Sequence, residues 1–154
     1  MSDDLGSLAK GGILRAAINT GNRALVQKNG DLLSGVSPAL ARRLAHLIGA
    51  ELRTVIYDGA GKVFADAHED VWDVGFLAVD PMRAEKIAFT RPYHSIEATF
   101  AVRAGSELSD VKTVDRPGVK VLTSTGSAYD MHLTKTLTHA RLERSGTPSE
   151  SFTE

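Results

Sequence analysis

Short apolar runs of strand length alternate along this chain with stretches that have a helical pattern. We expect strands at residues 13–18, 52–57, 72–79, 97–103 and 119–123. We expect helices at residues 37–49, 60–69 and 125–137, with a short helical turn at 80–86. A strand, a helix and a further strand form the repeating unit of a parallel sheet. The sequence therefore predicts an α/β fold, with a mainly parallel sheet flanked by helices.

The expected helix at residues 37–49 carries the clearest pattern. Ser37 suits the N-cap and Pro38 suits the first helical position. An apolar stripe at helical spacing is expected to face the sheet, and it consists of Leu40, Leu44, Leu47 and Ile48. The preceding loop, residues 19–36, is rich in glycine and asparagine, which favours a turn at Asn29-Gly30.

Charge and composition exclude several classes of function. The 18 basic and 19 acidic side chains leave a net charge of −1, which disfavours binding to nucleic acid or to an anionic membrane. The absence of cysteine excludes disulfides, thiolate catalysis and zinc held by sulfur. The five histidines form no pair at metal-binding spacing, and no nucleotide motif is complete. We therefore expect neither a metal nor a cofactor.

Both ends of the sequence carry signals of their own. The first residues are acidic and no apolar segment follows, so a secretory leader is not expected within this sequence. This pattern suits a cytoplasmic protein or one whose leader is missing. Near the other end, Thr147-Pro148-Ser149-Glu150 is a capping box that predicts the start of a helix. Because few residues follow, the pattern favours a shortened chain over a frayed polar tail.

The segment from Ser124 to Ser127 is the first candidate binding site. It lies between an expected strand and an expected helix, and it contains Thr125 and Gly126. The backbone N–H groups and the dipole at the start of a helix favour an anion. A simple helix cap, with Asp130 in the first turn, explains the same residues equally well.

Arg83 is the second candidate. It falls in the first turn of the helix that Asp80 and Pro81 are expected to open, where a cation is unfavourable. Such an arginine can serve a carboxylate, which it grips with two parallel hydrogen bonds. On the residues alone, a solvated arginine paired with Glu85 or Asp80 is the favoured interpretation.

Polar residues follow several of the expected strands. Ligands of open α/β sheets bind beyond the carboxyl ends of the strands, so their convergence indicates a binding site. Turns also need polar residues, which gives the same pattern a structural explanation. The residues at these ends are Asn19, Asn22, Asp58, Asp80 and the segment 124–127, with Arg83 slightly beyond.

Five segments of the sequence together resemble the solute-binding proteins of the type II periplasmic fold, especially the polar amino acid family. They are residues 14–19, 35–41, 72–77, 83–93 and 121–129. The most specific of these matches is Arg83 followed by the string Ile87-Ala88-Phe89-Thr90-Arg91-Pro92-Tyr93. The resemblance spans nearly the whole chain.

The resemblance implies two lobes that close on a small ligand. It implies that Arg83 grips the ligand carboxylate and that Thr125-Gly126-Ser127 share it from the second lobe. It also implies that Asn19 is a polar contact, and that Ala78, through its carbonyl, and Asp80 recognise an α-amino group. The lobes it implies are residues 1–103 and, after a connector at 104–118, the start of a second lobe at 119–154.

By this resemblance the protein binds an amino acid or a related carboxylate as the substrate-binding protein of an ABC transporter. A transporter permease would be its partner, and the periplasm its location. Two alternatives stay open: a dehydratase of the same fold acting on a prephenate-like acid, and a ligand-sensing module. An incomplete sheet would expose an edge, so self-association through that edge is expected.

Overall fold

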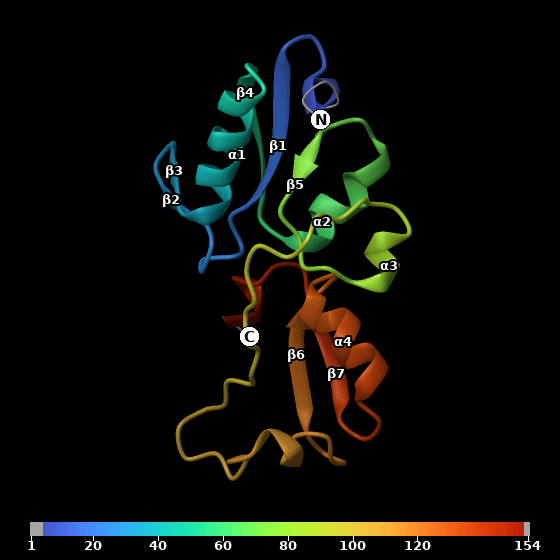
Figure 1. Ribbon diagram of the computed structural model, residues 1–154. Coiled ribbons are helices and arrows are strands. Elements are labelled where there is room, and N and C mark those ends of the chain that lie inside the picture. The colour runs from blue at the N-terminus through green and yellow to red at the C-terminus, as the bar shows by residue number, and fades with distance from the viewer. Residues whose placement is uncertain (1–4, 153–154) are drawn as a thin grey trace. The chain divides into compact units, whose positions relative to one another are not determined.

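The computed structural model describes residues 5–152 and divides the chain into two compact units, Met1–Ala88 and Phe89–Glu154 (Figure 1). The sequence placed the end of the first lobe at residue 103. In the structure, residues 89–103 and the expected connector 104–118 belong to the second compact unit. The predicted lobe boundaries, residues 1–103 and 119–154, stay a prediction. We call the two parts unit 1 and unit 2.

Unit 1 is built on a parallel sheet of three strands in the order β4-β1-β5. The strands are β1 (Ile13–Asn19), β4 (Glu51–Tyr57) and β5 (Val74–Gly75). The helices are α1 (Val36–Leu47), α2 (Ala60–Ala65) and α3 (Pro81–Ala84), with 3-10 turns at Leu5–Leu8 and Asp66–His68. This arrangement confirms the α/β fold and its parallel sheet.

The alternation of side chains along β1 explains why both faces of this sheet are covered. Ala16 and Ile18 point to one face and pack in one cluster with Ala41 of α1. Ala17 points to the other face and packs with Val63 of α2. A central parallel strand is buried on both faces, so it reads as a continuous apolar run rather than an alternating one.

The prediction that the apolar stripe of α1 faces the sheet is wrong. The buried residues of this helix are Ser37, Pro38, Ala41 and Ala45, while Leu40 and Leu47 are exposed. Small side chains allow the helix backbone to approach the sheet closely, and the larger leucines are left on its flank. The cap is also different, because Gly35 precedes the helix and Ser37 makes no side-chain cap.

The loop before α1 contains a β-hairpin. Strands β2 (Gln27–Asn29) and β3 (Leu32–Ser34) pair in antiparallel fashion. Gly30 has a φ of 57° between them, in the left-handed region that a tight hairpin turn requires. The turn predicted at Asn29-Gly30 is therefore confirmed.

Unit 2 contains a two-stranded parallel sheet of β6 (Lys120–Ser124) and β7 (Arg141–Ser145). The helix α4 (Ala128–Thr136) connects the two strands, and 3-10 turns lie at Val111–Thr113 and Glu150–Phe152. The core consists of Val114, Val121 and Leu133. Strand β7 was not predicted, because its charged residues hide the apolar pattern of a strand.

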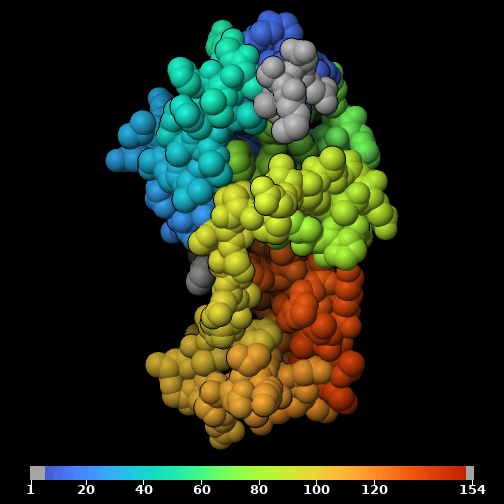
Figure 2. Space-filling view, in the orientation of Figure 1, coloured from blue at the N-terminus to red at the C-terminus, as the bar shows by residue number. Residues whose placement is uncertain are grey.

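Residues 97–103 do not form the strand that their composition predicts. The segment has no regular structure, and nearly all of it is exposed along the surface in Figure 2, where it is coloured yellow to ochre. A strand needs a neighbour to satisfy its backbone groups. Within the described residues these seven have no strand partner, so β-propensity alone does not make them a strand.

Two sequence signals near helix starts are confirmed. Thr147 N–H donates to Glu150 Oε2 at 2.8 Å, and Glu150 N–H donates to Thr147 Oγ1 at 3.3 Å, which is a complete capping box. Asp80 caps α3 by accepting a hydrogen bond from Met82 N–H at 2.9 Å. No helix within the described residues is long and apolar enough to span a membrane.

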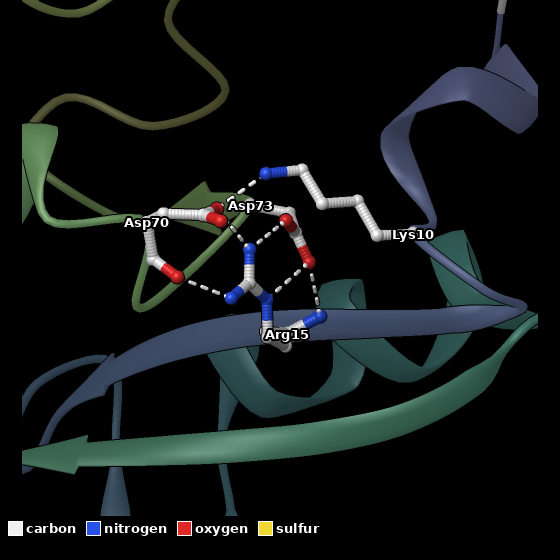
Figure 3. A network of polar contacts seen from close by, with 4 residues as sticks. All are labelled: Lys10, Arg15, Asp70 and Asp73. Carbon is white, nitrogen blue, oxygen red and sulfur yellow. Dashed lines mark hydrogen bonds and ion pairs between the residues drawn. The ribbon is translucent and has the colours of Figure 1, made fainter.

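An ion-pair network ties the start of β1 to the loop before β5 (Figure 3). Arg15 donates from Nη2 to Asp73 Oδ1 at 2.6 Å and to Asp70 Oδ1 at 2.7 Å, and Lys10 pairs with Asp70 as well. These contacts lower the pKa of Asp70 to about 2. Arg15 lies near the amino end of β1. The network is therefore at the end of the sheet opposite the carboxyl ends of the strands, where the ligand site is predicted.

Candidate ligand-binding residues at the strand ends

The carboxyl ends of β1 and β4 lie side by side and bring two predicted residues together. Asn19 is the last residue of β1 and pairs in register with Tyr57, which Asp58 follows. Thr20 N–H donates to Tyr57 O at 2.8 Å and so joins the two loops. Asn19 is buried, whereas Asp58 is exposed and forms an ion pair with Lys62 at 2.8 Å.

The turn after β1 is held against the turn after β4. Asn19 Oδ1 accepts a hydrogen bond from Gly21 N–H at 3.0 Å. A Cβ at Gly21 would lie 2.5 Å from Asp58 O, so only glycine fits this close approach. Asn22 is partly buried, and its carbonyl accepts from Val26 N–H at 2.9 Å. These contacts fix the backbone around the predicted residues Asn19, Asn22 and Asp58, at the carboxyl ends of β1 and β4.

Arg83 is completely buried, which corrects the solvated arginine that the residues alone favoured. Its Nη1 donates to Ala78 O at 3.1 Å, so the side chain turns back toward the extended segment that follows β5. Burial lowers the pKa of the Arg83 guanidinium, and the charge of Asp80 opposes that shift. The arginine still remains protonated, because its ordinary pKa is far above neutrality.

Ala78 and Asp80 both belong to the surroundings of Arg83. The Ala78 carbonyl accepts from the guanidinium, and the Asp80 carboxylate caps α3. A carbonyl oxygen and a carboxylate can each accept further hydrogen bonds. The predicted role of these two residues toward an α-amino group is therefore compatible with their contacts and stays a prediction.

The loop between β6 and α4 in unit 2 uses its backbone donors internally. Thr125 N–H donates to Ser145 O at 2.8 Å, Gly126 N–H donates to Asp130 Oδ2 at 2.9 Å, and Ser127 N–H donates to Ser124 O at 3.2 Å. Ser127 also caps α4, because its Oγ accepts from Asp130 N–H at 3.0 Å. The helix-cap explanation of this segment is confirmed, and its anion-binding role stays a prediction.

Sequence reasoning missed an ion pair behind this loop, between the buried Asp130 and the exposed Arg144. Asp130 is buried and accepts from Arg144 Nε at 2.8 Å and from Thr134 Oγ1 at 3.2 Å. The spacing of Ser127 and Asp130, typical of a capped helix start, pointed to the carboxylate. Nothing pointed to Arg144, because strand β7 itself was not predicted.

The described residues thus form two groups at carboxyl strand ends, one in each unit. The group in unit 1 contains Asn19, Asn22, Asp58, Ala78, Asp80 and Arg83, and the group in unit 2 contains Ser124, Thr125, Gly126 and Ser127. Side-chain hydroxyls, amides and a buried guanidinium suit the binding of a small polar molecule. Among these described residues no three histidine or acidic side chains gather as metal ligands would.

Comparisons with solved structures identify the fold. An ancestral amino acid-binding protein, a precursor of cyclohexadienyl dehydratase, is similar with a TM-score of 0.83 and 21% identity, over 97% of this chain and 68% of that chain. The cysteine-binding protein from Campylobacter jejuni is similar with a TM-score of 0.81 and 20% identity, over 97% and 61%. The arginine-bound form of truncated ArgBP from T. maritima is similar with a TM-score of 0.74 and 18% identity, over 99% and 71%.

The chain therefore has the fold of type II periplasmic binding proteins, as its motifs predicted. It spans 61% to 71% of the length of the three chains compared. No protein-family model and no curated protein matches the sequence.

Proposed function

We propose that this protein binds a small carboxylate-bearing solute, most simply an amino acid, and that it serves as the substrate-binding protein of an ABC transporter. The observation that carries this proposal is the complete burial of Arg83 beyond the carboxyl ends of the unit 1 strands. The fold supports it, because similar structures are an amino acid-binding protein, a cysteine-binding protein and an arginine-bound protein.

Burial of a guanidinium is costly unless an anion compensates its charge. The carboxylate of Asp80 supplies compensating charge to Arg83 and also caps α3. A ligand carboxylate would accept two parallel N–H groups of Arg83, which is the strongest geometry available to such a pair. A carboxylate-bearing ligand therefore fits this half of the site better than a neutral or cationic one.

Transport supplies the biological setting of the proposal. A similar structure is described as a binding component of an ABC transporter complexed with lysine. By the same fold similarity, a permease is the proposed partner and the periplasm the proposed location. Binding would then involve no bond making or breaking.

The dehydratase alternative is favoured by one comparison, because a similar ancestral protein is a precursor of cyclohexadienyl dehydratase. Elimination of water and carbon dioxide needs a general acid at the leaving group. The buried carboxylate of Asp130 is engaged by Gly126, Thr134 and Arg144, which leaves it poorly placed for that role. An absorbance assay for phenylpyruvate formed from prephenate separates the alternatives, and turnover would contradict pure binding.

A thermal-shift screen of the chain tests the proposal. The panel contains lysine, arginine, cysteine and the other common amino acids, together with succinate and glutarate. A ligand at about 100 times its Kd stabilises the folded state by about 2.7 kcal/mol. We expect one subset of amino acids to raise the Tm, and we expect amides of the same amino acids to have little effect. A melt that responds to none of these compounds would contradict the proposal.

A further inference from the structure

We propose that Asp130 is a positioning residue for the ligand-binding loop of unit 2, and that Arg144 holds Asp130 in place for this task. The loop is the segment 124–127, so this inference rests on the proposed function. Asp130 would not touch the ligand. It would act by fixing Gly126 and thereby holding the loop so that the first amides of α4, at Ala128 and Tyr129, are available to an anion.

The first argument is the reciprocal contact between Asp130 and the loop. Gly126 N–H donates to Asp130 Oδ2 at 2.9 Å, and Asp130 N–H donates to Ser127 Oγ at 3.0 Å. Gly126 has a φ of 68°, a conformation that residues other than glycine rarely adopt. The carboxylate thus fixes the amide of the one loop residue whose backbone has the widest freedom.

The second argument is the arrangement behind the carboxylate. Arg144 Nε donates to Asp130 Oδ1 at 2.8 Å, and Arg144 Nη2 donates to Thr134 Oγ1 at 2.7 Å. Thr134 Oγ1 in turn donates to Asp130 Oδ1 at 3.2 Å. Asp130 is 8% exposed, so this buried charge depends on the arginine for its compensation. The oxygen that faces the loop is distinct from the oxygen that faces Arg144.

The consequence concerns the donors that remain for a ligand. Thr125, Gly126 and Ser127 donate their N–H groups within unit 2. The first N–H groups of a helix have no partner within the helix, and Asp130 N–H is capped by Ser127. The first turn, at Ala128 and Tyr129, therefore supplies the amides that a ligand carboxylate would use. Loss of Asp130 would remove its hydrogen bond with Gly126 N–H and allow the loop to move away from this arrangement.

The test compares three variants of the intact chain by amide hydrogen exchange and by titration calorimetry. The probe is the amino acid that gives the largest thermal shift with the wild-type chain. For Asp130→Ala we expect Gly126 N–H to exchange about tenfold faster, as the loss of one hydrogen bond to a charged group implies. We also expect weaker binding of the probe. Asp130→Asn keeps an acceptor oxygen, so it should restore much of the Gly126 protection.

The control is Thr136→Val, which removes an exposed threonine hydroxyl of the same helix that donates to His132 O at 3.0 Å instead of to the carboxylate. We expect it to leave both Gly126 exchange and probe affinity unchanged. The amide of Leu133, in the core of unit 2, reports whether each variant stays folded. Should Asp130→Ala not fold, Arg144→Gln provides the second route, with faster Gly126 exchange and weaker binding expected.

Two results would overturn the inference. One is unchanged Gly126 exchange in Asp130→Ala, which would show that the carboxylate does not fix the loop. The other is faster exchange with unchanged affinity, which would show that the loop position does not matter for binding. If the wild-type chain binds no amino acid, the proposed function fails, and Asp130 then has no positioning role in binding. Gly126 exchange would still report separately whether Asp130 fixes the loop.

Discussion

The two candidate groups of residues, one in each unit, contain buried charges of opposite sign. In unit 1 the buried group is a cation, Arg83, and the carboxylate that most influences it, Asp80, also caps a helix. In unit 2 the buried group is an anion, Asp130, and Arg144 compensates it directly at 2.8 Å. Unit 1 therefore buries a cation at its candidate residues, whereas unit 2 buries an anion that an arginine contacts directly.

This difference indicates how much each unit should contribute to the free energy of ligand binding. Under the proposed function, Arg83 would offer a ligand carboxylate a cationic donor, whereas the start of α4 would offer it uncharged amide donors. Both contacts are charge-assisted, because the carboxylate is ionised, but only the arginine contact joins two opposite charges and can form two parallel hydrogen bonds. We therefore expect affinity to depend mainly on unit 1, and stability of the loop to depend on the ion pair of unit 2.

The largest effect is expected for Arg83→Met. Removing one partner of a buried charge pair costs on the order of 2–5 kcal/mol of binding free energy. Stability should fall as well, because the variant removes the donor to Ala78 O and the charge that Asp80 faces. Titration calorimetry and thermal unfolding measure the two quantities. Arg43→Met, at an exposed arginine of α1, is the matched control and should alter neither.

A clear effect of acid is expected in unit 2 through Asp115. Its carboxylate accepts hydrogen bonds from the N–H groups of Thr138, His139 and Ala140, which hold its pKa well below the usual range. A depressed pKa in the folded state gives stability that is complete above about pH 4 and is lost as pH falls further. Asp115→Asn should therefore flatten the decline of Tm between pH 5 and pH 2.5. A decline as steep as that of the wild type would contradict this assignment.

A smaller effect of acid is expected in unit 1 through Asp70, because its side chain is more exposed than that of Asp115. Contacts with Lys10 and Arg15 lower the pKa of Asp70 to about 2, so its contribution is also lost as pH falls from about 4 toward 2. Trp72 is the only tryptophan of the sequence and lies in unit 1. Its fluorescence should show a weaker acid dependence in Asp70→Asn than in the wild type. Equal acid dependence in the two proteins would argue against the network.

The smallest effect is expected at the Asp58–Lys62 pair. Both side chains are more than half exposed, at 55% and 57%, and exposed pairs contribute at most about 1 kcal/mol. Lys62→Ala should shift the Tm only slightly. It also tests Asp58 as a ligand contact, because release from Lys62 should change ligand affinity only if Asp58 faces the ligand. A large loss of stability would show that the pair has more than a surface role.

Local patterns in the sequence predicted most elements of the fold correctly. Strands β1, β4 and β6, the turn at Asn29-Gly30 and the capping box from Thr147 to Glu150 were all recognised. Each depends on neighbours within a few residues, where periodicity and capping chemistry act. The resemblance also led to the correct fold, because it rests on several motifs in a fixed order.

The features that sequence analysis missed depend on partners far along the chain. Leu40 and Leu47 belong to the predicted apolar stripe of α1, yet both are exposed. Ala41 faces the sheet, because its small side chain lets the helix backbone pack close to the sheet. Residues 97–103 have the composition of a strand but no neighbouring strand within the described residues. Arg83 looked solvated because burial of a charge is a tertiary property. Self-association through an open sheet edge stays a prediction, which analytical ultracentrifugation would test.

The most direct test of a ligand carboxylate on Arg83 is a two-by-two calorimetric comparison. Wild type and Arg83→Met are each titrated with the amino acid that gives the largest thermal shift and with its carboxamide, in which an uncharged amide replaces the carboxylate. The account predicts that the wild type prefers the acid by on the order of 2–5 kcal/mol and that the variant loses most of this preference. An equal preference in both proteins, or none in the wild type, would contradict it.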